Sequence, residues 1–367
     1  KIYRMIWSGM ARKFFLIILL LIFAAAAAFG QSGRIKPTPE ELPSKDRERI
    51  IYVPTQLPNP KAKPTPTPTP KTNDDDDGEI IRVQSALVAI PVSVTDPQGR
   101  AVTALKLEDF LLEIDGKASE ISELSRSSNT PVRLALLFDN SSSVRIAREF
   151  EKKAAIRFFR QVIRPEKDLV ALFSVASTTE LEQPLTRDVS SLVRAIELFA
   201  EPAGGTQLLD GIIQAAQYLN STEGRRIIVI VSDGEDNLSD STLEQTVRAA
   251  QLNNCQIYVV KTTDFENIKR TGARGGNANT IFLSAERRMQ ELARQTGGAV
   301  YSPVDEKELD AAFTRISAEL SQQYILNYYP AEDEKDKRGE FRAISLKVKN
   351  RENLTVRTRK GYYVPKK

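Results

Sequence analysis

The hydrophobic pattern separates a middle part of the chain, about residues 131–322, from two flanks. In the middle part, mostly apolar runs typical of buried strands alternate with apolar residues three and four apart, which are typical of amphipathic helices. The expected strands are Val132–Phe138, Leu169–Val175, Ile227–Val231, Ile257–Val260 and Ala299–Tyr301. The expected helices cover 147–162, 190–199, 208–219, 242–253, 285–296 and 306–320. This alternation predicts an α/β fold, a doubly wound and mostly parallel sheet with helices on both faces and an antiparallel edge strand at Thr178–Gln183.

Both flanks show the period-two alternation of half-buried strands. It runs over 88–94 and 110–114 before the middle part, and over 324–329, 344–348 and 354–356 after it. Asp115-Gly116 adds a strong signal for a two-residue hairpin. Each flank has only about 45 residues, too few to bury a core alone. We therefore expect the N-terminal β segment (80–130) and the C-terminal β segment (323–367) to pair into one small β-sandwich, with the α/β domain (131–322) inserted between them.

The first 79 residues predict export and a spacer. Basic residues, an apolar run from Phe14 to Phe29 and small residues ending at Gly30 are typical of a signal peptide over 1–30, with a retained signal anchor as the alternative. We expect the protein to be periplasmic, at the cell surface or secreted, touching a membrane only if that anchor is uncleaved. Residues 31–79 are rich in proline and include the acidic run Asp74–Asp77, which predicts a disordered, extended linker.

Composition excludes several classes of function. The chain has no histidine, which removes Ser-His-Asp and Cys-His catalysis as well as histidine metal sites. Its single cysteine, Cys255, excludes an intramolecular disulfide and is expected to be buried in a strand. Without the basic residues of the leader, the chain has as many basic as acidic residues, and we expect no nucleic-acid partner.

Three oxygen-rich loops are expected at the carboxyl ends of the sheet strands, where such folds bind ligands. They are Asp139-x-Ser141-x-Ser143, Gly204-Gly205-Thr206 and Ser232-Asp233-Gly234. Each alone has an ordinary explanation as a helix cap or turn. Together they offer two carboxylates and three hydroxyls, a shell that suits a hard divalent cation: magnesium first, with calcium or manganese as alternatives. The predicted metal ligands are Asp139, Ser141, Ser143, Thr206 and Asp233.

The three loops, in this order on a Rossmann-like alternation, resemble the von Willebrand factor A (VWA) domain family and its metal-ion-dependent adhesion site. The resemblance implies that the serines and the threonine contact the ion, that the aspartates help to hold it, and that a carboxylate of a protein ligand completes the shell. The flank stretches 94–117, 323–330, 341–349 and 359–365 resemble a bacterial group of VWA-related exported proteins. That likeness covers about residues 80–365.

The leading interpretation is therefore an exported, metal-dependent module that binds an Asp or Glu carboxylate of a partner protein and is not an enzyme. One alternative is a magnesium-dependent phosphatase-like enzyme using Asp139, although such enzymes carry a second aspartate where this chain has Ser141. The other is a structural scaffold that binds no ion.

A further stretch, Phe265–Thr280, predicts a mobile loop on the same edge of the sheet. We interpret its basic residues, Lys269, Arg270 and Arg274, as solvated charge. Recruitment of an acidic partner is the alternative.

Overall fold

The computed structural model describes residues 87–272, 280–330 and 339–364, which lie within one unit of the chain over 79–367. The expected signal peptide (1–30), the linker (31–79) and Arg274 lie outside the described residues. Within the described ranges, no helix combines the length and the apolar character needed to cross a membrane. The domain boundaries at 130 and 322 stay predictions.

Six strands form the central sheet, in the order β10-β9-β8-β5-β6-β7. They are β5 (Val132–Asp139), β6 (Leu169–Val175), β7 (Thr179–Thr186), β8 (Arg225–Ser232), β9 (Cys255–Lys261) and β10 (Val300–Tyr301). All neighbours are parallel except β7, which pairs antiparallel with β6 at the edge, as predicted. The chain leaves β5 toward β6 on one side and returns to β8 on the other. The carboxyl ends of β5 and β8 therefore flank the point where connections diverge, the usual ligand position in such a sheet.

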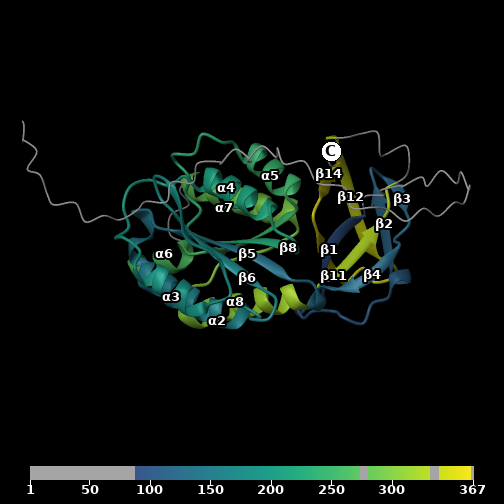
Figure 1. Cartoon of the computed structure of the whole chain (residues 1–367), viewed down its shortest axis with the longest axis horizontal. Helices are drawn as coiled ribbons and strands as arrows, with labels where there is room; N and C mark the ends of the chain where they lie inside the picture. Colours follow the sequence, from purple (N-terminus) through teal and green to yellow (C-terminus); the bar gives the residue numbers. More distant parts are fainter. Residues whose placement is uncertain (1–86, 273–279, 331–338, 365–367) are drawn as a thin grey trace, which may run out of the picture. The chain divides into compact units, whose positions relative to one another are not determined.

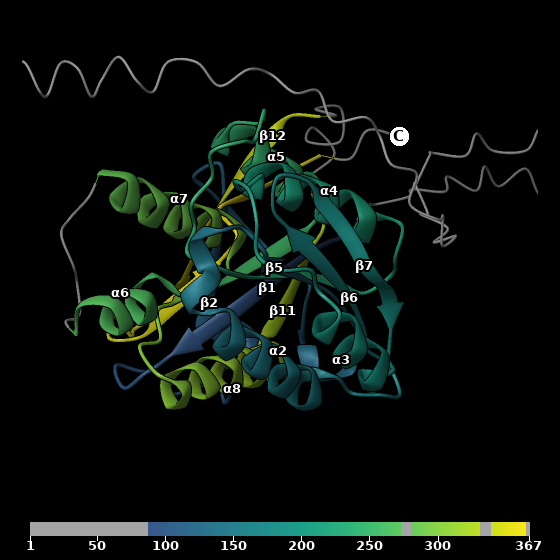
Figure 2. The same cartoon turned by 90° about the vertical axis from the view of Figure 1, so that its left-hand side faces the viewer.

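Helices cover both faces of this sheet (Figures 1 and 2). One face is covered by α2 (Arg148–Val162), α3 (Val189–Glu197) and α8 (Glu306–Gln322). The other is covered by α4 (Leu208–Asn220), α5 (Leu243–Leu252) and α7 (Thr280–Thr296). The predicted fold class, a doubly wound α/β domain, is confirmed.

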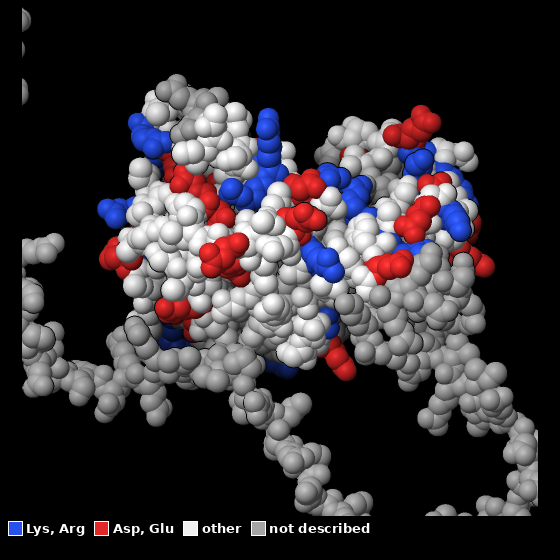
Figure 3. Space-filling view, turned by 90° about the horizontal axis from the view of Figure 1, so that it is seen from above, with Lys and Arg blue, Asp and Glu red and all other residues white. Residues whose placement is uncertain are grey.

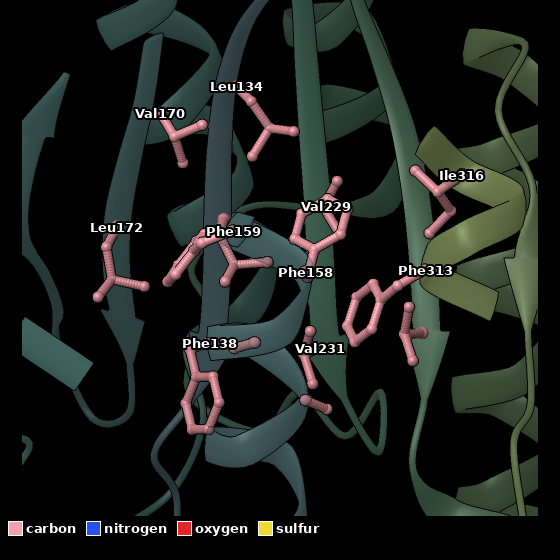
Figure 4. Close-up of a cluster of buried hydrophobic side chains, with 14 of the residues drawn as sticks. Leu134, Phe138, Phe158, Phe159, Val170, Leu172, Val229, Val231, Phe313 and Ile316 are labelled. Atoms are coloured by element: carbon pink, nitrogen blue, oxygen red, sulfur yellow. The ribbon is translucent and has the colours of Figure 1, made fainter. Parts of the chain in front are cut away.

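The strands are apolar on both sides because helices bury both faces. Along β5, Leu134 and Phe138 point toward the layer of α2 and α8, where they pack with Phe158 and Phe313 (Figure 4). The alternate residue Leu137 points into the opposite layer. Burying each such side chain stabilises the fold by about 1.5–3 kcal/mol. This packing holds the carboxyl end of β5, and with it Asp139, in a fixed position.

The flanks form two four-stranded antiparallel sheets, β13-β1-β11-β4 and β14-β12-β2-β3. Their strands are β1 (Val88–Thr95), β2 (Phe110–Ile114), β3 (Lys117–Ser119), β4 (Glu123–Arg126), β11 (Tyr324–Tyr328), β12 (Phe341–Val348), β13 (Thr355–Thr358) and β14 (Gly361–Tyr363). Strand β1 pairs with β11 and β13, and β2 pairs with β12, so each sheet contains strands from both flanks. Buried side chains of both sheets, including Ile90, Leu112 and Leu326, share one core. The predicted β-sandwich built from both flanks is confirmed.

A polar network joins the α/β domain to this sandwich around the carboxylate of Glu319 on α8. Glu319 accepts hydrogen bonds from Ser93 of β1 (2.5 Å) and from Tyr258 of β9 (2.9 Å), and it pairs with Arg357 of β13 (2.5 Å). Gln323, the residue between α8 and β11, donates to both Ser93 and Tyr258. These contacts tie the end of α8 to three strands.

The prediction of a loop over Phe265–Thr280 is wrong for the first half of that segment. Helix α6 (Thr263–Thr271) occupies that part and ends at Gly272, whose φ of 73° is the left-handed C-cap that glycine favours. The aromatic ring of Phe265 is buried and stacks on Phe150 of α2 at 3.8 Å between ring centroids, which anchors α6 to the domain.

Candidate metal centre

The first loop of the predicted site leaves the carboxyl end of β5 and folds back on itself. The backbone N–H of Ser141 donates to Asp139 Oδ1 (2.9 Å), and the hydroxyls of Ser141 and Ser143 lie 2.9 Å apart. Ser143 opens the short 3-10 helix η3 (Ser143–Ile146). This turn brings together one carboxylate and two hydroxyls from alternate residues of the chain.

The second loop, Gly204-Gly205-Thr206, lies between the other two and is hydrogen-bonded to both. On one side Ser142 donates to Gly204 O through its N–H (3.2 Å) and its hydroxyl (2.8 Å). On the other side Thr206 N–H donates to Asn237 Oδ1 (2.8 Å), and Thr206 O accepts from the backbone of Asn237 (3.1 Å). Thr206 is thereby buried between the loops that follow β5 and β8.

The two glycines are needed because the neighbouring loops approach this loop so closely. A Cβ on Gly204, whose φ is 75°, would stand 2.2 Å from Ser177 Oγ, and one on Gly205 would stand 2.4 Å from Asn237 Oδ1. Only glycine fits such contacts without displacing a neighbour. The two glycines of this loop therefore serve close packing.

The third loop brings Asp233 to the same place. Ser232, the last residue of β8, donates its hydroxyl to Asp139 Oδ2 (2.5 Å), which joins β8 to the end of β5. Asp233 Oδ1 accepts from the N–H of Glu235 (2.9 Å), and the nearby Ser143 hydroxyl favours the ionised form of the Asp233 carboxylate and so lowers its pKa. The chain therefore links all three predicted loops through direct contacts.

Both aspartates are buried, and neither forms an ion pair with a basic side chain of the described residues. Asp139 is 1% exposed and Asp233 is 2% exposed. Burial, and then the nearby charge of Asp233, raises the pKa of Asp139 to about 7, although hydrogen bonds from Ser141 and Ser232 oppose the shift. Burial likewise raises the pKa of Asp233. Two buried carboxylates without a cation are unfavourable, and a divalent ion would neutralise both.

The donor set fits a hard cation. Two carboxylates and three hydroxyls match the oxygen chemistry of magnesium, calcium and manganese sites. Among the described residues, no three of the His, Cys, Asp and Glu side chains are grouped closely enough to hold a metal by themselves. The hydroxyls of Ser141, Ser143 and Thr206 would therefore have to supply the remaining ligands.

Several residues that support the site were not predicted. Ser232 and Asn237 position Asp139 and Thr206, as described above. Arg148 of α2 is buried and donates to Asn140 Oδ1 and to Phe199 O (3.1 Å), joining the first loop to the chain that leads to the second. Ser232 belongs to the predicted third loop, but its bond to Asp139, like the contacts of Asn237 and Arg148, depends on residues that the fold brings together.

A groove of about 790 Å³ opens beside the site among the first turns of α4, α5 and α7. Leu209, Leu243 and Leu283 supply its apolar part, and Arg287 and Arg288 its basic part. The lining also includes Glu291, whose carboxylate pairs with Arg294. Arg288 also donates to Gly234 O (2.8 Å), directly after Asp233, so the groove begins next to the predicted ligands. On this face of the molecule, acidic and basic side chains are otherwise interspersed (Figure 3).

The basic residues of the expected loop lie on α6. Lys269 places its ammonium 5.5 Å from the ring centroid of Phe265, and Arg270 donates to Asn267 Oδ1 (2.8 Å). Both side chains are exposed. Their interpretation as solvated charge stays a prediction.

Comparison with known proteins identifies the class of domain that carries these loops. Residues 134–235 match the family model described as the von Willebrand factor type A domain, and the chain contains a VWA domain.

Individual relatives are distant. A Borreliella burgdorferi protein described as uncharacterized is 24% identical over 227 residues, which cover 58% of this chain and 65% of that protein. Among solved structures, BatB from Bacteroides thetaiotaomicron is 19% identical with a TM-score of 0.41 and covers 51% of this chain and 98% of its own. The PilB minor pilin from Streptococcus sanguinis is 13% identical with a TM-score of 0.40, over 53% of this chain and 62% of the pilin.

Proposed function

We propose that the protein is an exported, cation-dependent protein-binding module. Asp139, Ser141, Ser143, Thr206 and Asp233 would hold one divalent ion, magnesium first, with calcium or manganese as alternatives. The observation that carries the proposal is the meeting of three interlocked loops around two buried carboxylates that form no ion pair within the part of the chain that the structure describes. VWA domains often bind divalent cations and are typically non-catalytic, which agrees with this assignment.

The bound ion would supply a Lewis-acidic centre for a carboxylate of the partner protein. Three of the five ligands are neutral hydroxyls, so the two aspartates offset the charge of a divalent ion without exceeding it. An ion held in this way still attracts an Asp or Glu side chain from outside. The role of the protein is to keep the five oxygens in place and to leave one side accessible.

We infer that the groove beside the site receives the partner residues next to that acid. Its leucines would accept an apolar side chain, and Arg287 and Arg288 favour a partner segment carrying additional negative charge. The partner is therefore expected to present an acidic and apolar stretch rather than a lone carboxylate. Replacing the exposed Arg287 by Glu should weaken binding of such a segment while leaving ion binding intact.

Calorimetric titration of the full chain with magnesium, manganese and calcium chloride tests the proposal. We expect one bound ion per chain, lost in Asp139→Ala, with circular dichroism unchanged because the substitution removes a buried charge rather than a packed apolar group. Absence of binding by the wild-type chain to all three ions would refute the proposal and leave the scaffold interpretation. Magnesium-dependent hydrolysis of phosphoesters, lost in Asp139→Asn, would instead favour the phosphatase-like alternative.

Export is proposed from the leader alone. N-terminal sequencing of the secreted or periplasmic protein should give a chain that begins after Gly30 if the leader is a signal peptide. A chain that retains the leader and fractionates with membranes would identify it as an anchor.

A further inference from the structure

A third buried carboxylate, Glu151, lies beside the predicted metal ligands and has no evident structural use. Glu151 is in the first turn of α2 and is 0% exposed, and neither of its carboxylate oxygens has a hydrogen-bond partner among the described residues. The Thr262 hydroxyl lies near enough to favour the ionised form but outside hydrogen-bond geometry with Glu151. A buried carboxylate left in this state destabilises the fold unless a positive charge compensates it.

The packing of α2 against α6 brings Glu151 to the metal site. The stacked rings of Phe150 and Phe265 are the sequence neighbours of Glu151 and Glu266, so the two glutamates lie where these helices meet. Thr262 N–H donates to Ser232 O (3.1 Å), and the Thr263 hydroxyl donates to Asp233 O (2.9 Å). The start of α6 is therefore bonded directly to the third metal loop.

The electrostatics agree with this placement. After burial, the charge of Asp139 is the largest influence that raises the pKa of Glu151, and Glu266 and Asp233 raise it further. The buried guanidinium of Arg148, one turn earlier on α2, interacts with the charge of Glu151 but gives its hydrogen bonds to Asn140 Oδ1 and to the carbonyls of Phe199 and Ala200. It therefore leaves the Glu151 oxygens without a hydrogen bond. Glu266 is only partly buried and has Arg270 nearby, so Glu151 is the carboxylate that most needs a compensating cation.

We infer that Glu151 is part of the cation centre, as an outer carboxylate that strengthens the binding of the divalent ion without entering its coordination shell. Its oxygens are not grouped closely enough with those of both aspartates to form a three-carboxylate site, so it acts through its charge or through an ordered water. This inference rests on the proposed function. Glu151 would raise the affinity for the ion and lower the stability of the cation-free protein.

The experiment compares Glu151→Gln with the wild-type full chain by manganese titration and by thermal unfolding in EDTA. The amide has the shape of the carboxylate without its charge. We expect manganese affinity to fall about tenfold, as for other residues that support metal ligands, and the melting temperature in EDTA to rise. A purely structural role would leave manganese affinity unchanged. Only an electrostatic role of Glu151 lowers the manganese affinity of the variant and at the same time raises its melting temperature in EDTA.

Two further variants serve as controls. Glu149→Gln removes an exposed charge from the same turn of α2 and should leave both measurements unchanged. Glu151→Asp keeps the charge and should retain affinity within about threefold of wild type even if it loosens packing. If the wild type binds manganese and Glu151→Gln binds it equally well, this inference is wrong while the proposed function stands. If the wild type binds no ion, both are wrong.

Discussion

Asp139 should make the stability of the cation-free protein depend on pH. Its pKa is about 7 in the folded chain against an ordinary value of 3.8, so between these values the folded state holds a proton that the unfolded state has released. Stability without cation therefore rises as the pH falls from about 8 to 6 and is lost as the pH rises through 7. The chain has no histidine, the usual source of pH dependence in this range. Glu266, whose pKa burial raises to about 8, adds to the same trend, so Asp139→Asn is needed to isolate the part due to Asp139.

Thermal unfolding in EDTA at pH 6, 7 and 8 measures this effect. We expect a melting temperature several degrees higher at pH 6 than at pH 8, and a flatter profile in Asp139→Asn. Saturating magnesium should reverse the trend, because protons and the cation compete for the same carboxylates. A wild-type profile in EDTA that is flat or rises with pH would contradict the assigned pKa.

Gly205 is a second residue whose replacement should disturb the site. Because its Cβ would stand 2.4 Å from Asn237 Oδ1 and 2.8 Å from Leu238 Cδ1, Gly205→Ala must displace both side chains, and Asn237 Oδ1 is the acceptor for the Thr206 N–H. We expect a loss of about 1–3 kcal/mol in the free energy of unfolding and a clear loss of ion affinity. Urea unfolding and calorimetry would measure the two effects. Glu201→Ala, an exposed change in the same connection, should alter neither.

For single residues, the sequence alone could predict candidate metal ligands but not the residues that hold them in position. Asp139 and Asp233 each follow a recognisable apolar strand, so their placement on one edge follows from the strand order. Ser232 also lies at the end of a strand, yet its bond to Asp139 depends on the pairing of β8 with β5. In the sequence, Glu151 looks like any polar residue of an amphipathic helix, whereas the fold buries it completely.

Among the secondary-structure elements, α8 carries the contact that holds the α/β domain to the sandwich. Removing the Glu319 carboxylate leaves Arg357, Tyr258 and Ser93 without their shared acceptor in a mostly buried place. We expect Glu319→Ala to lower the free energy of unfolding by about 2–4 kcal/mol. Urea unfolding checks this value. Glu306→Ala removes an exposed charge from the same helix and should change stability by less than about 0.5 kcal/mol, and an equal effect of both would contradict the network.

The sequence predicted the long amphipathic helices and the apolar strands but missed α6. Strands such as β5 and β8 each contain an uninterrupted apolar run, 134–138 and 227–231, which predicts a buried strand. The α6 segment is nine residues long, carries several charges and runs directly into Gly272, so its composition looked like a loop. Its helical structure depends on the burial of Phe265 against α2, a long-range contact.

For the molecule as a whole, the pairing of the two flanks could be predicted from a size argument. Neither flank can bury a core alone, and the structure places strands of both in each small sheet. The order of the strands could not be predicted, because period-two alternation shows which face is buried but not which strand is the neighbour. The strand order is fixed by specific pairs such as β1 with β11 and β2 with β12.

Because the two flanks share one core, a substitution that destabilises one flank should also destabilise the other. Ile90 on β1 is 0% exposed in the shared core, so Ile90→Ala should destabilise the sandwich by about 2–5 kcal/mol. Hydrogen exchange should then accelerate in β2, β11, β12 and β13, more than two hundred residues away for the last three, while β5 and β8 stay protected. Faster exchange confined to β1 would mean that the flanks do not unfold as one unit, since a shared core must lose its protection on both sides together.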